Sequence, residues 1–123
     1  MITCASVSAS SQWYQRVLGF ASGHGGDEYE MLMFDGVLAL QLHESDVHEH
    51  PYLAREGTPL GGNGVALYFE TSSYTDALDR VLATDAEVLE ADHINPLANH
   101  REVWLRDPDG YVVVVSSRYG DVG

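Results

Sequence analysis

The 123-residue sequence contains a single cysteine, Cys4, no long apolar run and only six basic residues. One cysteine cannot build an internal disulfide framework, so we expect Cys4 to be a small buried strand residue in a reducing compartment. No apolar stretch reaches the length of a transmembrane helix, and no charged segment followed by an apolar one opens the chain as a signal peptide would. These absences predict a cytoplasmic protein with no membrane partner.

The shortage of basic residues leaves the chain strongly acidic, because nineteen Asp and Glu side chains give a formal net charge of −13. That charge argues against a nucleic-acid partner, since binding phosphates requires a basic patch. It argues equally against anionic membrane surfaces. A cationic small molecule would be attracted by the negative field of the protein. The alternative interpretation is that the excess of acidic side chains only keeps the protein soluble.

The chain contains two similar halves. Gln15-Arg-Val-Leu18 and Asp79-Arg-Val-Leu82 are nearly identical, and each lies within a helical pattern. Ser10 or Ser11 is the expected cap of the first helix, which stops at Gly19, and Ser72 or Ser73 is the expected cap of the second. Strands are expected at 2–7, 20–23, 28–34 and 37–43 in the first half, and at 65–70, 87–91 and within 101–115 in the second.

Each half therefore has the order βαβββ, which predicts an α+β domain made of two tandem modules. A lone βαβββ unit cannot bury both faces of its sheet, so two such units must pack together. We expect a single domain over residues 1–123, with module 1 at about 1–45, a linker at about 46–63 and module 2 at about 64–118.

The most informative segment is the hairpin Arg101-Glu-Val-Trp-Leu-Arg-Asp-Pro-Asp-Gly-Tyr-Val-Val-Val-Val115. Pro108 sets φ at the second turn position and Gly110 accepts a positive φ. Together with Trp13-Tyr-x-x-Val-Leu-Gly-Phe20 and Gly64-Val-Ala-Leu-Tyr-Phe69, it resembles the glyoxalase/bleomycin resistance protein/dioxygenase (vicinal oxygen chelate, VOC) superfamily. The resemblance covers essentially the whole chain. It implies that each module curls into a half-barrel sheet around a cavity, and that the protein is a homodimer.

The enzymes of this superfamily bind a catalytic divalent metal through one residue of the first strand and one of the last strand of each module. The resemblance places these four positions on Met1 (or Ile2), Gln41, Ala66 and Val114. Alanine and valine carry no ligand atom, so we expect neither a metal at the inherited site nor any cofactor. The segment from His43 to His50 holds three imidazoles and three carboxylates. It reads equally well as a solvated acidic loop, so its metal binding stays open.

The cavity wall follows from the alternation of side chains along strands. If Val114 stands where the superfamily has an inward glutamate, the inward side chains are apolar and aromatic with a few polar groups, the composition of a small-molecule pocket. The superfamily places a binding side chain three residues before the turn aspartate, which here is Trp104. The predicted ligand-binding residues are Gln41, His43, Tyr68, Glu70, Glu102, Trp104, Arg106, Val112 and Val114. The competing interpretation is that Trp104 and Tyr68 simply fill the core.

The resemblance is closest in character to the metal-free bleomycin-resistance-like members, which are acidic dimers that sequester a cationic drug. It implies a metal-independent binding protein, with no catalytic residue, that sequesters an antibiotic or another aromatic or cationic compound. Some members carry a drug-clamping tryptophan where this chain has Asn99 and His100, which argues against bleomycin itself. Two alternatives stay open. The first is a glyoxalase- or dioxygenase-type enzyme, which would either bind a metal at a non-standard site or use His43 and Glu70 as acid and base. The second is an interaction module without a small ligand.

Overall fold

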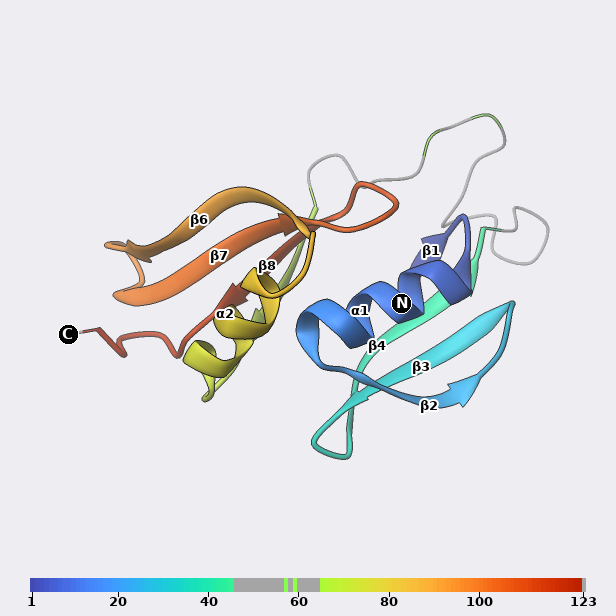
Figure 1. Cartoon of the computed structure of the whole chain (residues 1–123), viewed down its shortest axis with the longest axis horizontal. Helices are drawn as coiled ribbons and strands as arrows, with labels where there is room; N and C mark the ends of the chain where they lie inside the picture. The colour runs from blue at the N-terminus through green and yellow to red at the C-terminus, as the bar shows by residue number, and fades with distance from the viewer. Residues whose placement is uncertain (46–56, 58, 60–64, 123) are drawn as a thin grey trace. The chain divides into compact units, whose positions relative to one another are not determined.

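The computed structural model describes residues 1–45, 57, 59 and 65–122, and the chain forms two compact units, Met1–Gly61 and Gly62–Gly123. The described residues of each unit form one helix and one four-stranded sheet (Figure 1). Unit 1 contains β1 (Ile2–Cys4), α1 (Val7–Leu18), β2 (Ala21–Gly25), β3 (Tyr29–Phe34) and β4 (Val37–Glu44). Unit 2 contains β5 (Ala66–Glu70), α2 (Tyr74–Leu82), β6 (Glu87–Asn95), β7 (His100–Arg106) and β8 (Val112–Ser116). The predicted α+β class with two tandem βαβββ modules is confirmed.

The two sheets have the same topology. Their strand orders are β1-β4-β3-β2 and β5-β8-β7-β6, and in each the first strand of the unit pairs in parallel with the last. The remaining pairs are antiparallel. Neither sheet closes into a barrel, because its two outer strands do not pair with one another. This identical order in both units is what an internal duplication predicts.

Helix α1 starts earlier than the sequence predicted. The N-cap is Ser6, whose Oγ accepts a hydrogen bond from the Ala9 N–H at 3.1 Å, and not Ser10 or Ser11. Both of those serines lie inside the helix and are buried, since the apolar side of α1 extends back to Val7. The helix ends as predicted at Gly19, which adopts φ 73° and donates its N–H to the Gln15 carbonyl.

The two helix N-termini provide a matched test of side-chain capping. Ser73 occupies the N-cap position of α2 but makes no side-chain capping bond. We expect Ser6→Ala to lower the free energy of unfolding by about 1 kcal/mol, and Ser73→Ala to lower it by only a few tenths. Urea unfolding of both variants measures the difference. Equal effects would contradict a capping role for Ser6.

In unit 2, α2 covers the face of the sheet that carries Arg101, Val103 and Leu105. The Arg101 guanidinium lies 5.0 Å from the centre of the Tyr74 ring, and α2 lies beside β8 (Figure 1). The core of this unit is formed by the buried apolar side chains of the helix and the sheet, namely Ala77, Leu78, Val81, Val103, Leu105, Val113 and Val115. The opposite face of the sheet is therefore free of α2.

Strand β6 is longer than the predicted 87–91, because it continues to Asn95. The sequence of this strand lacks a clean alternation of apolar and polar residues, and its pairing with β7 shifts register twice, between Val88 and Glu90 and between Glu90 and His93. Backbone pairing with β7 extends the strand, bringing His93 opposite Glu102 and Asn95 opposite His100. The extension adds side chains that the sequence analysis did not assign to any strand.

The β7–β8 hairpin turns as its sequence predicted. The Asp107 carboxylate accepts hydrogen bonds from the N–H groups of Asp109 and Tyr111 at 2.9 and 2.8 Å, and Gly110 adopts φ 93°. Cys4 is fully buried on β1, also as predicted. Among the described residues, no helix is long and apolar enough to cross a membrane. The predicted linker lies almost wholly outside the described residues, and so do His48 and His50.

Candidate ligand-binding face

The predicted binding residues of unit 2 lie on one face of its sheet, the face opposite α2. Strand register places them in three rows, because residues paired across neighbouring strands point to the same side. The rows across β5, β8 and β7 are Tyr68–Val114–Trp104, Glu70–Ser116–Glu102 and Ala66–Val112–Arg106. Tyr68 and Trp104 therefore flank Val114 from either side.

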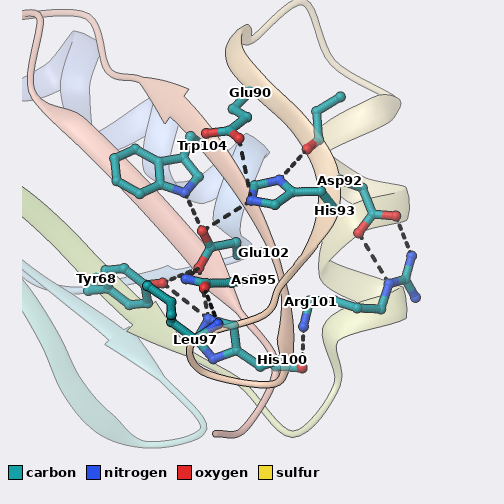
Figure 2. Close-up of polar contacts among 12 residues, drawn as sticks. Tyr68, Glu90, Asp92, His93, Asn95, Leu97, His100, Arg101, Glu102 and Trp104 are labelled. Carbon is teal, nitrogen blue, oxygen red and sulfur yellow. Dashed lines mark hydrogen bonds and ion pairs between the residues drawn. The ribbon is translucent and has the colours of Figure 1, made fainter. Parts of the chain in front are cut away.

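Glu102 is the centre of a polar cluster on this face. Its side chain is only 2% exposed, yet it carries a carboxylate, so the fold must supply hydrogen-bond donors to it. Figure 2 shows these donors converging on the carboxylate from three strands. They are the Tyr68 hydroxyl, Trp104 Nε1 at 2.8 Å, His100 Nε2 at 2.7 Å, Asn95 Nδ2 at 3.3 Å and His93 Nε2 at 3.2 Å.

These donors keep Glu102 ionised. Burial alone would raise the pKa of the Glu102 carboxyl, but hydrogen bonds from Tyr68, Trp104, His100 and Asn95 outweigh it and lower that pKa to about 2. The same interaction acts in the opposite direction on the tyrosine: burial, and then the bond to the Glu102 carboxylate, raise the pKa of Tyr68. At neutral pH the cluster therefore contains a carboxylate anion and a protonated phenol.

The surroundings of His93 favour its protonated form next to this anion. Its Nδ1 lies 2.8 Å from the Ala91 carbonyl oxygen, and its Nε2 lies 3.2 Å from Glu102 Oε1 and 3.5 Å from Glu90 Oε1. Both ring nitrogens face acceptors, so both are best satisfied when they carry hydrogen. The Ala91 carbonyl and then the two carboxylates accordingly raise the pKa of His93, although burial opposes them.

The two aromatic side chains of the face are anchored by their polar atoms. Tyr68 is 47% exposed and Trp104 is partly exposed, yet both donate to the same carboxylate (Figure 2). A side chain fixed at its polar end loses less rotamer freedom when a ligand covers its ring. The geometry thus offers two pre-oriented, partly exposed aromatic side chains on either side of the buried Val114.

Sequence reasoning missed three members of this cluster: His93, Asn95 and His100. For His100 a signal was available, because residues 100, 102 and 104 alternate along β7 and share a face. His93 and Asn95 required the true length of β6, which the sequence pattern did not indicate.

The other predicted residues have local partners. Arg106 Nη1 donates to the Gly110 carbonyl at 2.9 Å, so this side chain supports the hairpin turn, and Glu70 is exposed at the end of β5. In unit 1, Gln41 Nε2 donates to the Tyr29 hydroxyl at 3.1 Å, while His43 is buried with its Nδ1 2.8 Å from the Glu44 carbonyl oxygen.

The α2 face of the same sheet carries a second polar cluster. Arg101 binds Asp92 through two hydrogen bonds of 2.5 and 3.2 Å, and the Tyr74 hydroxyl donates to Asp92 at 2.8 Å. The Arg101 guanidinium accordingly lowers the pKa of Asp92. This ion pair joins β6, β7 and α2, and a hollow of about 370 Å³ lies beside Tyr74 and Arg101. The bonds of Asp92 to Arg101 and to Tyr74 hold α2 against the sheet.

Solved structures with the same arrangement of elements identify the fold. A glyoxalase/bleomycin resistance protein/dioxygenase family enzyme from Burkholderia phytofirmans PsJN aligns with a TM-score of 0.73 and 20% identity, over 94% of this chain and 93% of its own. A glyoxalase/bleomycin resistance protein/dioxygenase from Nocardioides aligns with a TM-score of 0.73 and 21% identity, over 99% and 82%. A glyoxalase-related enzyme from Fulvimarina pelagi gives 0.70 and 18%, over 96% and 87%.

The chain has the glyoxalase/bleomycin resistance protein/dioxygenase fold. No protein-family model matches the sequence. No curated protein matches it either.

The metal that the VOC resemblance implies does not fit the residues present in this VOC-fold chain. At the two positions of the second module, Ala66 on β5 and Val114 on β8 offer no oxygen, nitrogen or sulfur atom in their side chains. Within the described part of the chain, no group of three or more His, Cys, Asp or Glu side chains is arranged to hold a metal ion. The His93–Glu102–His100 cluster is instead a hydrogen-bonded network.

Proposed function

We propose that the protein binds a planar aromatic or cationic small molecule, without a metal ion, on the sheet face that carries Tyr68 and Trp104. The observation that carries this proposal is the anchoring of both partly exposed aromatic side chains on one buried, ionised carboxylate, Glu102. Both side chains stay partly exposed while their polar atoms are held, so a flat ligand can reach their rings.

The chemistry of the face supports this kind of ligand. Val112, which is partly exposed, provides apolar surface in the row next to Tyr68 and Trp104. Tyrosine and tryptophan rings stack on flat molecules and attract cations, each contributing about 0.5–2 kcal/mol. The net charge of −13 adds a long-range attraction for cations. Sequestration of an antibiotic or another aromatic, cationic compound is the biological role that we propose, with a homodimer as its form.

Fluorescence titration tests the proposal. Trp13 is buried in unit 1, so a Trp13→Phe variant leaves Trp104 as the only indole emitter. We expect saturable quenching of Trp104 by planar aromatic cations such as thionine or proflavine, unchanged by EDTA. Elemental analysis of the purified protein should accompany the titration. Failure of every compound in a broad antibiotic and dye panel to saturate, or quenching that requires an added divalent metal, would contradict it.

A further inference from the structure

We infer that the ligand donates a hydrogen bond to Nδ1 of His100, so the preferred ligand is an aromatic compound with an N–H or O–H group at its edge. The inference rests on the proposed function, because it names the chemical class of the compound bound on the same face. It follows from which atoms around Glu102 donate and which accept hydrogen bonds.

The first step is the proton on the His100 ring. An ionised carboxylate can only accept hydrogen bonds, and His100 Nε2 lies 2.7 Å from Glu102 Oε2. Nε2 must therefore carry hydrogen. In the imidazole tautomer with hydrogen on Nε2, Nδ1 has a bare lone pair and is an acceptor.

The second step is that this acceptor is unsatisfied. His100 is only 6% exposed, and its Nδ1 is buried without a hydrogen-bond partner among the described residues. His93 differs, because its Nδ1 faces the Ala91 carbonyl oxygen at 2.8 Å. An unpaired buried polar atom is costly, and native proteins keep few of them unless a function uses them.

The third step is the position of His100 on the binding face. His100 and Trp104 lie on the same side of β7 and both contact the Glu102 carboxylate, at 2.7 and 2.8 Å. Tyr68 lies near the His100 end, since its ring centre is 6.2 Å from that of His100. A flat compound that covers the Tyr68 ring and carries an amino group at its edge brings that donor next to His100.

A matched pair of dyes tests the donor requirement. Thionine and methylene blue are both planar three-ring cations, but thionine has amino N–H groups where methylene blue has dimethylamino groups. By isothermal titration calorimetry we expect thionine to bind about tenfold more tightly than methylene blue, the effect of one satisfied buried acceptor. In His100→Leu, whose side chain has no hydrogen-bond acceptor, this preference should disappear. In His93→Gln the preference should persist, whatever happens to the affinity for both dyes.

A ligand-free measurement makes the inference independent of the dyes. The ¹⁵N shifts of the His100 ring should show a protonated Nε2 and an unprotonated Nδ1 near neutral pH. A protonated Nδ1, or equal affinity for the two dyes in the unmodified protein, would overturn the inference and leave the proposed function intact. Absence of binding by both dyes and by the wider panel would overturn the proposed function as well.

Discussion

Replacing Glu102 with glutamine should lower the free energy of unfolding at neutral pH by about 3 kcal/mol, the range measured when one partner of a buried ion pair is removed. The glutamine amide would turn a donor group toward side chains that are themselves donors, such as Tyr68 and Trp104. It would also remove the buried carboxylate that faces His93 Nε2 at 3.2 Å. Urea unfolding measures the loss.

The pH dependence of the unmodified protein should show the same cluster. Glu102 has a lowered pKa, so the stability it contributes is present above pH 4.5 and is lost as the pH falls from there toward about 2. His93 has a raised pKa, so its contribution is present below pH 6.5 and is lost as the pH rises through its folded-state pKa. The joint contribution is therefore largest between about pH 4.5 and 6.5, and Glu102→Gln should remove the acid limb that Glu102 causes.

Glu90→Gln is the matched control, because the Glu90 side chain also contacts His93 but is 60% exposed. Its cost should stay below about 0.5 kcal/mol, as is usual for exposed ion pairs. If Glu102→Gln were no more destabilising than Glu90→Gln, the carboxylate would not organise this face.

Replacing Trp104 with leucine should weaken the binding of thionine about 30-fold or more, the loss typical of an aromatic residue at the centre of a binding site. Leucine keeps an apolar side chain next to Val114 but removes both the flat ring and its anchor on Glu102. Calorimetric titration measures the affinity, and circular dichroism confirms that the variant is folded.

Trp13→Phe serves as the comparison, because Trp13 packs edge-on against Tyr14 in unit 1. It should leave the affinity for thionine unchanged. Undiminished binding by Trp104→Leu would instead favour the competing interpretation of Trp104 as a residue that merely fills the core.

Much of the fold was predictable because its determinants are local. The end of α1 depends on Gly19, which alone tolerates the left-handed conformation there at little cost. The hairpin depends on Asp107 and Gly110 within one turn. The start of α1 was predicted wrongly because several serines compete for the cap, and burial of Val7 and Ser10 decides among them. The end of β6 was predicted wrongly because its own residues show no strand pattern after Ala91. Backbone pairing with β7 is what extends the strand to Asn95.

The sequence by itself determined the two βαβββ modules, the alternation that puts Trp104 and Glu102 on one face, and the lack of ligand atoms at Ala66 and Val114. These properties depend on residue identity and on spacing along one strand or helix. Only the tertiary structure decided that Glu102 is a buried anion that holds Tyr68 and Trp104, and that His100 Nδ1 is buried without a partner in the described part of the chain. The donors to Glu102 come from β5, β6 and β7. The pKa of a side chain and the number of its hydrogen-bond partners depend on neighbours in space. The spacing of residues along the chain does not specify those neighbours.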